Sequence, residues 1–214
     1  MDIKIFKVAS EGLQTIFLLA AIGWLLSLFG FKFLSVLFFI LTIFVLFFFR
    51  DPERVIVYNS DAFVSPADGR VIEISEHPEN DYLEKNYKRI SIFLSIFDCH
   101  INRFPVSGKV LGTKYHPGRF IMAFKKSSSE LNEKLSTFIE STNGIHIVLV
   151  QVAGFLARRI ISSASLDNEF SQGQRFGMIK FGSRVDLYIP LESRVEVTLG
   201  QKVRAGETIL AWLN

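Results

Sequence analysis

The chain has 214 residues, a net charge of +3 with histidine neutral, and a single cysteine, Cys99. One cysteine excludes an intramolecular disulfide and argues against a cysteine-based metal site, so we expect no metal. The small, scattered basic excess does not indicate nucleic-acid binding, but it suits contact with an anionic lipid surface.

The N-terminal part contains two apolar runs, at residues 13–29 and 33–49, of about 17 residues each, which is within the range of membrane helices. Gly30, Phe31 and Lys32 separate them. We therefore predict a membrane-anchoring helical hairpin over residues 1–49. A cleaved signal peptide is disfavoured because no small-residue cleavage site follows the first run. A single long, bent or re-entrant insertion stays open.

The charges that flank the hairpin predict its orientation. Lys4 and Lys7 precede it, and Arg50 and Arg54 follow it. Because positive residues favour the cytoplasmic side, we expect both ends there, with the rest of the chain on the cytoplasmic face of the cell membrane. Lys32, at the tip, argues mildly against this orientation.

The charged segment that starts at Arg50, with Pro52, marks a domain boundary, and residues 50–214 form the second domain. Short apolar runs bounded by Gly, Pro, Asn and Asp are typical of strands. Ser127 to Ile139, with serines at its start, is the best helix candidate in this part. The predicted strands are residues 70–74, 89–97, 108–113, 145–153, 184–189 and 194–198.

Two sequence patterns indicate the architecture. A proline turn, a glycine, a basic residue and a strand occur at residues 66–71 and again at residues 105–110. Residues 197–207 have the pattern G-Q-x-V-x-A-G-E, which resembles hairpins of lipoyl- and biotinyl-like barrels, where such segments pair with a partner half. We therefore predict a mainly β fold with some α: an intertwined lipoyl-like β-barrel or sandwich behind the membrane hairpin.

Gly182-Ser183 lies inside an apolar, strand-like run near the C-terminus. Glycine adopts strained backbone geometry most easily, so the Ser183 hydroxyl is placed to attack the carbonyl of Gly182 if that peptide bond is distorted and a base takes the proton. The alternative is a glycine bulge followed by a solvent-facing serine.

Other polar residues stand at the ends of predicted strands. Asp68 lies in a Pro-Ala-Asp-Gly turn, where it either caps its own backbone or orients a histidine. His100 follows an apolar strand, within a segment dense in functional groups. His116 lies in a turn that either lines a cleft or shapes a loop. Cys99 is expected in the core, because neighbouring strand residues point to opposite faces and cannot form a Cys–His dyad.

Arg158 and Arg159 end another apolar run. A guanidinium offers two parallel donors, so one of them is a candidate for binding a phosphate or carboxylate of a substrate. A pairing with an acidic side chain of the protein explains them equally well.

Taken together, these segments resemble the phosphatidylserine decarboxylase family, specifically its short archaeal-like or bacterial branch. The resemblance covers nearly all of the chain after residue 48, with the motifs in family order. The matching segments are residues 49–54, 65–69, 100–105, 115–118, 152–154, 157–160 and 177–184.

The resemblance implies a proenzyme that cuts itself between Gly182 and Ser183. A pyruvoyl group made from Ser183 would then serve as the cofactor, forming a Schiff base with the amine of phosphatidylserine and accepting electrons as CO2 leaves. His100 would return the proton to the α-carbon, and Asp68 would act in self-cleavage together with a histidine.

One departure concerns the base. Longer family members carry a second histidine in the segment that matches residues 99–105, and Arg103 stands in its place here. Arginine is too strongly protonated to act as a base. Either His100 serves both steps or His116 supplies the base, and we favour His100.

The expected partners are a phospholipid in the membrane and the two chains produced by cleavage, with no nucleic acid; a homo-oligomer stays open. Two other functions explain parts of the sequence. A membrane-anchored lipoyl-like adaptor or carrier explains the hairpin pattern, but Lys180 is a poor carrier lysine and no coiled-coil run is present. A hydrolase with Ser183 as an ordinary nucleophile lacks the Gly-x-Ser-x-Gly elbow.

Overall fold

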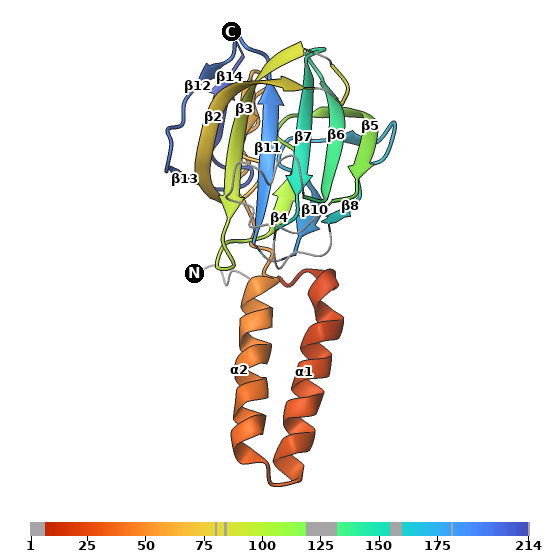
Figure 1. The fold of residues 1–214 in the computed structure, drawn as a ribbon, viewed down its shortest axis with the longest axis vertical. Coiled ribbons are helices and arrows are strands. Elements are labelled where there is room, and N and C mark those ends of the chain that lie inside the picture. Colours follow the sequence, from red (N-terminus) through yellow and green to blue (C-terminus); the bar gives the residue numbers. More distant parts are fainter. Residues whose placement is uncertain are drawn as a thin grey trace. The chain divides into compact units, whose positions relative to one another are not determined.

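The computed structural model describes residues 7–79, 81–83, 85–118, 132–154, 160–180 and 182–213. The chain divides into two compact units, Met1–Glu53 and Arg54–Asn214, and each is described by itself. The first unit is helical, and the second consists of strands (Figure 1).

The helical unit contains two apolar helices, α1 (Ser10–Leu28) and α2 (Lys32–Phe48). A short turn joins them, in which Gly30 has a φ of +82°. The Ser35 hydroxyl donates a hydrogen bond to the carbonyl of Gly23, with an O···O distance of 2.8 Å, so the helices are in contact. α1 is long and apolar enough to cross a membrane, and α2 is shorter. The two predicted helices are confirmed; their insertion into a membrane stays a prediction.

The second unit is built from strands, as predicted. The strands are β1 (Ala62–Val64), β2 (Gly69–Glu79), β3 (Lys85–Leu94), β4 (Ile101–Arg103), β5 (Gly108–His116), β6 (Lys134–Ser141), β7 (His146–Val152), β8 (Ile160–Ser162), β9 (Glu169–Phe170), β10 (Arg175–Ile179), β11 (Ser183–Ile189), β12 (Arg194–Val195), β13 (Lys202–Val203) and β14 (Ile209–Trp212).

The strands form one large antiparallel sheet and two small ones. The large sheet has the order β13-β2-β3-β11-β7-β6-β5-β9, and the small sheets have the orders β1-β14-β12 and β4-β10-β8. Within the described part of the chain the two outer strands of the large sheet, β13 and β9, do not pair with each other. The sheet is therefore open rather than a closed barrel.

The strand order shows that the unit consists of two equivalent halves. Strands β1, β2, β3, β11, β12, β13 and β14 correspond, in this order, to β4, β5, β6, β7, β8, β9 and β10, because each set pairs in the same way. The sequence repeat at Pro66 and Pro105 marks this correspondence. The amide of Val64 donates to the carbonyl of Pro105 at 3.0 Å, and the amide of Arg103 donates to that of Pro66 at 2.9 Å.

The correspondence extends to the centre of the large sheet. Two equivalent rows of paired residues cross it: Arg70–Phe93–Arg184 and Lys109–Glu140–His146. Gly182 lies two positions before Arg184 and has a φ of +49°. Gly144 lies two positions before His146 and has a φ of +73°. Ser183 therefore corresponds to Ile145.

The second half is inserted into the first. The chain leaves the first half after β3, forms β4 to β10 without interruption, and returns at β11. In the second half, a tight turn around Gly144 joins β6 directly to β7. In the first half, the equivalent connection from β3 to β11 is replaced by two crossings. His100 lies at the outgoing crossing, and Gly182 with Ser183 lies at the returning one.

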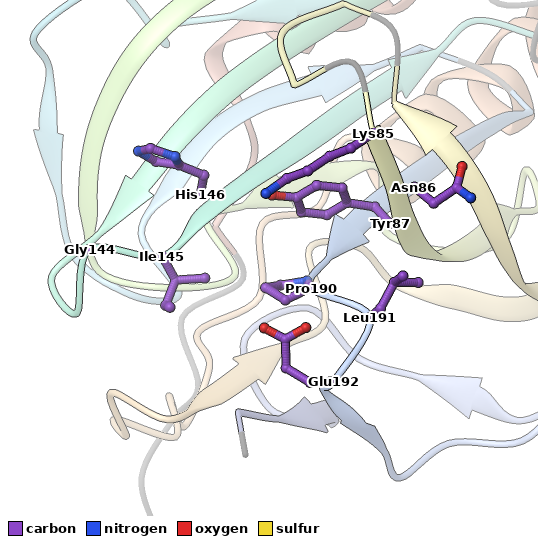
Figure 2. Close-up of a pocket in the computed structure, with 9 residues that line it drawn as sticks. All are labelled: Lys85, Asn86, Tyr87, Gly144, Ile145, His146, Pro190, Leu191 and Glu192. Carbon is purple, nitrogen blue, oxygen red and sulfur yellow. The ribbon is translucent and has the colours of Figure 1, made fainter.

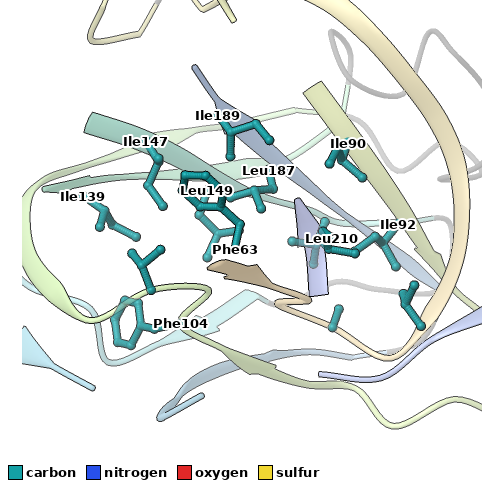
Figure 3. Packing of buried hydrophobic residues seen from close by; sticks show 14 of the residues in the cluster. Phe63, Ile90, Ile92, Phe104, Ile139, Ile147, Leu149, Leu187, Ile189 and Leu210 are labelled. Atoms are coloured by element: carbon teal, nitrogen blue, oxygen red, sulfur yellow. The ribbon is translucent and has the colours of Figure 1, made fainter. Parts of the chain in front are cut away.

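A large hydrophobic core covers one face of the large sheet, here called the inner face. It contains Ile90 and Ile92 from β3, Leu187 and Ile189 from β11, and Phe63 from a small sheet (Figure 3). Alternate residues on the central strands face it, as the two-residue period of strands requires. The periodic apolar pattern of the sequence thus marked this face correctly.

One predicted element is wrong. Residues 127–131 of the expected helix 127–139 lie outside the described residues, but Lys134–Ser141 forms strand β6. β6 pairs along its length with both β5 and β7. Pairing on two sides outweighs a local helix preference, because strand preference is decided by the neighbours.

Candidate active site

Gly182 and Ser183 occupy a constrained position at the start of β11. Gly182 has a φ of +49°, in the left-handed region that side chains disfavour. Ser183 is 0 % exposed and pairs with Leu94 at the end of β3. Its Oγ has no hydrogen-bond partner among the described residues. The alternative of a solvent-facing serine is therefore wrong: the hydroxyl is buried next to a glycine in an unusual backbone conformation.

His100 is also 0 % exposed. Its Nδ1 lies 3.0 Å from the carbonyl oxygen of Asp98, which accepts a hydrogen bond when Nδ1 carries the proton. In the neutral ring this makes Nε2 the basic nitrogen. With the proton on Nδ1, the imidazole is therefore able to act as a general base through Nε2.

The strand pairing brings His100 and Ser183 to the same end of the sheet. Ser183 pairs with Leu94, and the chain reaches His100 six positions further on. On the returning crossing, the amide of Ile179 donates to the carbonyl of His100 at 3.4 Å, four positions before Ser183. The outgoing and returning crossings therefore run side by side, with the two predicted residues on them.

Asp68 lies at this end too, beyond β3. Arg70 pairs with Phe93, so the turn that holds Asp68 lies next to the end of β3. The carboxylate accepts a hydrogen bond of 2.6 Å from Arg54 and one of 2.8 Å from the amide of Ala205. Burial lowers the pKa of the Arg54 guanidinium, but the charge of Asp68 and their hydrogen bond outweigh it and raise that pKa above its usual range.

The structure does not bring His116 to Ser183. His116 lies on β5, three strands from β11, which corresponds to about 14 Å. Its row of paired residues runs through Lys134 and Val152 to Arg184. Paired residues share a face and neighbours in a strand alternate, so His116 faces the side of the sheet opposite to Ser183.

His116 instead belongs to a cluster around Asp81. Its Nε2 lies 2.9 Å from one carboxylate oxygen, which also accepts a hydrogen bond of 2.6 Å from Ser136; Lys114 lies 3.1 Å from the other oxygen. Burial raises the pKa of Asp81, but the hydrogen bonds from Ser136 and Lys114 outweigh it and lower that pKa below its usual value. The cluster thus gives His116 a structural partner.

Sequence reasoning missed a buried ion pair directly after the serine. Arg184 and Asp186 are almost fully buried, and the guanidinium binds the carboxylate through two hydrogen bonds of 2.6 Å. Both point away from the core, on the same face of β11. The signal was present in the sequence as opposite charges two positions apart in a strand. The two charge-assisted hydrogen bonds compensate both buried charges within the strand that begins with Ser183.

A pocket of about 350 Å³ lies at the other end of the large sheet (Figure 2). Its lining includes Gly144, His146 and Pro190, and Pro190 directly follows β11. Ser183 begins the same seven-residue strand, which spans about 20 Å. The pocket is therefore the counterpart of the Ser183 site in the other half and not the site itself.

Arg158 and Arg159, the predicted substrate-binding residues, lie outside the described residues. Ser183 and His100 lie at the same end of the sheet. The buried Ser183 hydroxyl, which has no partner among the described residues and follows a glycine with positive φ, fits a group made from the serine.

Comparisons with known proteins identify the family of the chain. The family model for phosphatidylserine decarboxylase matches residues 41–211. The phosphatidylserine decarboxylase proenzyme of Geotalea daltonii is 42 % identical over 203 residues, which is 95 % of each chain. The proenzyme of the same name from Rickettsia typhi is 43 % identical over 211 residues, 97 % of this chain and 91 % of its own. That of Geobacter sp. (strain M21) is 44 % identical over 92 % of this chain and 89 % of its own. With matches of this extent, the chain belongs to the phosphatidylserine decarboxylase family.

Proposed function

We propose that the chain is a proenzyme that cuts itself between Gly182 and Ser183 and then converts phosphatidylserine to phosphatidylethanolamine and CO2. The observation that carries this proposal is the buried Ser183 hydroxyl, which has no described partner and follows a glycine with positive φ. Family membership supplies the reaction. The relatives are named proenzymes, a property that an adaptor or an ordinary hydrolase does not need.

Self-cleavage begins with His100, which takes the proton of the Ser183 hydroxyl through Nε2. The oxygen attacks the carbonyl carbon of Gly182, the peptide C–N bond breaks, and the nitrogen takes a proton, leaving an ester. Removal of the Ser183 α-proton then breaks the Cβ–Oγ bond and releases the Gly182 carboxylate. Water finally adds to the remaining unsaturated residue. Its nitrogen leaves as ammonia, and the oxygen of water becomes the ketone oxygen. The products are a chain of residues 1–182 and a chain that starts with a pyruvoyl group.

The pyruvoyl group supplies an electron sink for the loss of CO2 from an amine-bearing substrate. The residues of the chain provide proton transfer and substrate binding. His100, on the outgoing crossing, holds the proton that the α-carbon takes up after CO2 has left. Asp68, which accepts hydrogen bonds from Arg54 and from the amide of Ala205, is proposed to act in self-cleavage together with a histidine. Arg158 and Arg159 are proposed to bind the phosphate or carboxylate of the headgroup.

The helices α1 and α2 are proposed to anchor the protein in the cell membrane as a hairpin, with the second unit on the cytoplasmic face. Anchoring suits a lipid substrate, because extracting its acyl chains from a bilayer would cost on the order of 0.8 kcal/mol for each exposed CH2 group. The enzyme is thereby kept where the headgroups are.

The first test is the intact mass of the purified protein under denaturing conditions, next to a Ser183→Ala variant. We expect two fragments that split after Gly182 from the wild type, with the smaller one blocked to N-terminal sequencing, and one chain from the variant. A parallel assay follows the release of labelled CO2 from vesicles that contain carboxyl-labelled phosphatidylserine. A wild-type chain that stays whole and releases no CO2 would refute the proposal.

The base is tested separately. His100→Gln should slow cleavage by about 10²- to 10⁴-fold, the usual contribution of a positioned base. Cys99→Ala serves as the matched control, because Cys99 is the adjacent residue and is also buried. If both variants cleave like the wild type, His100 is not the base.

A further inference from the structure

Two buried amide side chains join the strand after His100 to the large sheet. Asn102 is the middle residue of β4, and Gln151 lies on β7. Both are 0 % exposed. The Nε2 of Gln151 donates a hydrogen bond of 2.8 Å to the Oδ1 of Asn102. This bond links a small sheet to the large one through the interior of the unit.

Each residue of the pair lies close to a residue of the candidate active site. Asn102 comes two positions after His100, which directly precedes β4. Gln151 pairs with Val185, which comes two positions after Ser183 on the inner face of the large sheet. The hydrogen bond therefore joins the segment that follows His100 to β7, next to β11, the strand that begins with Ser183. His100 and Ser183 must approach each other between the same two parts of the chain.

The repeated half shows that packing alone does not require amides here. By the correspondence of the two halves, Asn102 is equivalent to Phe63 and Gln151 to Ile189. Phe63 and Ile189 both belong to the hydrophobic core (Figure 3). Among the described residues, the polar pair thus occurs in one half only, the half whose first strand follows His100.

The surroundings of the pair are shaped for it. Gly177 pairs with Asn102, and a Cβ at Gly177 would lie 3.1 Å from the Nε2 of Gln151 and would collide with the carbonyl oxygen of Ile161. The Nδ2 of Asn102 and the Oε1 of Gln151 have no hydrogen-bond partner among the described residues. A buried pair that uses half of its hydrogen-bonding capacity is poorly suited to stability, and such departures concentrate at functional sites.

We propose that Asn102 and Gln151 are positioning residues for self-cleavage: their hydrogen bond holds β4 against β7 so that the imidazole of His100 meets the hydroxyl of Ser183. The inference rests on the proposed function. The pair acts through His100 and touches none of the reacting atoms. Without the bond, β4 keeps its pairing with β10 but loses this polar link to β7, and the imidazole moves away from the serine.

The first experiment measures the rate of self-cleavage by pulse-chase labelling of the full chain. Gln151→Met and Asn102→Leu keep the size of the side chains and remove the bond. We expect each to slow cleavage by about 10²-fold, the effect of a displacement of about 1 Å at a reacting group. Ile147→Val is the control, because Ile147 lies on the same strand and face as Gln151 and loses one methyl group. It should cleave at the wild-type rate.

The second experiment reads His100 directly. In the uncleavable Ser183→Ala background, NMR of labelled histidine resolves the four imidazoles of the chain. We expect Gln151→Met to shift the resonances of His100 and to leave the other three unchanged. Three outcomes would each overturn the inference while the wild type still cleaves. They are unchanged His100 resonances, cleavage of both amide variants at the wild-type rate, and an equal slowing by Ile147→Val. A wild type that stays whole would instead overturn the proposed function and the inference with it.

Discussion

Gly182 is the position where the backbone itself can be tested. Its φ of +49° lies in the left-handed region, and a Cβ at this position would meet no atom within 4 Å. The substitution Gly182→Ala therefore adds no collision, and its whole cost is conformational. For an L-residue this cost is about 1–2 kcal/mol.

This cost predicts a definite effect on the rate. If cleavage requires the observed backbone at Gly182, the population of that conformation falls with the added 1–2 kcal/mol, which corresponds to a slowing of about 5- to 30-fold. Gly182→Asn should be slowed less, because asparagine tolerates the left-handed region better than alanine does. The assay is pulse-chase labelling in a cell-free system, with the full chain and the two products separated on a gel.

The equivalent glycine of the other half provides a matched control. Gly144 has a φ of +73° and equally open surroundings, but it lies at the end of the sheet away from Ser183. Gly144→Ala should lower the unfolding free energy by a similar amount and leave the cleavage rate unchanged. The reasoning is refuted if Gly182→Ala cleaves as fast as the wild type, or if Gly144→Ala is slowed to the same extent.

Three further outcomes are expected. His116→Gln should leave the cleavage rate unchanged in the same assay, because His116 lies three strands away on the other face; a slowing like that of His100→Gln would contradict this placement. Because the pKa of Asp81 is lowered, its contribution to stability is present above its usual pKa of 3.8 and is lost as the pH falls through the lower folded value. Urea unfolding should show that Asp81→Asn is destabilised at neutral pH and that this destabilisation shrinks on acidification. A destabilisation that stays constant with pH would contradict this reasoning. Arg54→Met leaves the largely buried carboxylate of Asp68 without its cation, so the unfolding free energy should fall by about 3–5 kcal/mol; a loss below about 1 kcal/mol would show that the pair is not effectively buried.

Much of the site was predictable because its chemistry is local in the sequence. A serine after a glycine, a histidine after an apolar strand and an aspartate in a proline turn are each readable from neighbouring residues, and their order along the chain identified the family. The choice between His100 and His116 was not readable in this way. It depends on how many strands separate β5 from β11 and on the face that each side chain takes, and both follow from the pairing of distant segments.

The sequence by itself determined the two apolar helices, the β-rich second part and the family, because composition, two-residue alternation and motif order are properties of contiguous residues. Only the tertiary structure decided that residues 134–141 form a strand, that the sheet stays open, and that one half is inserted into the other. It also revealed that the insertion places His100 and Ser183 on adjacent crossings, and that a hydrogen bond joins Asn102 to Gln151 nearby. The physical reason is that these features come from hydrogen bonds between residues far apart in the chain, which no local pattern encodes.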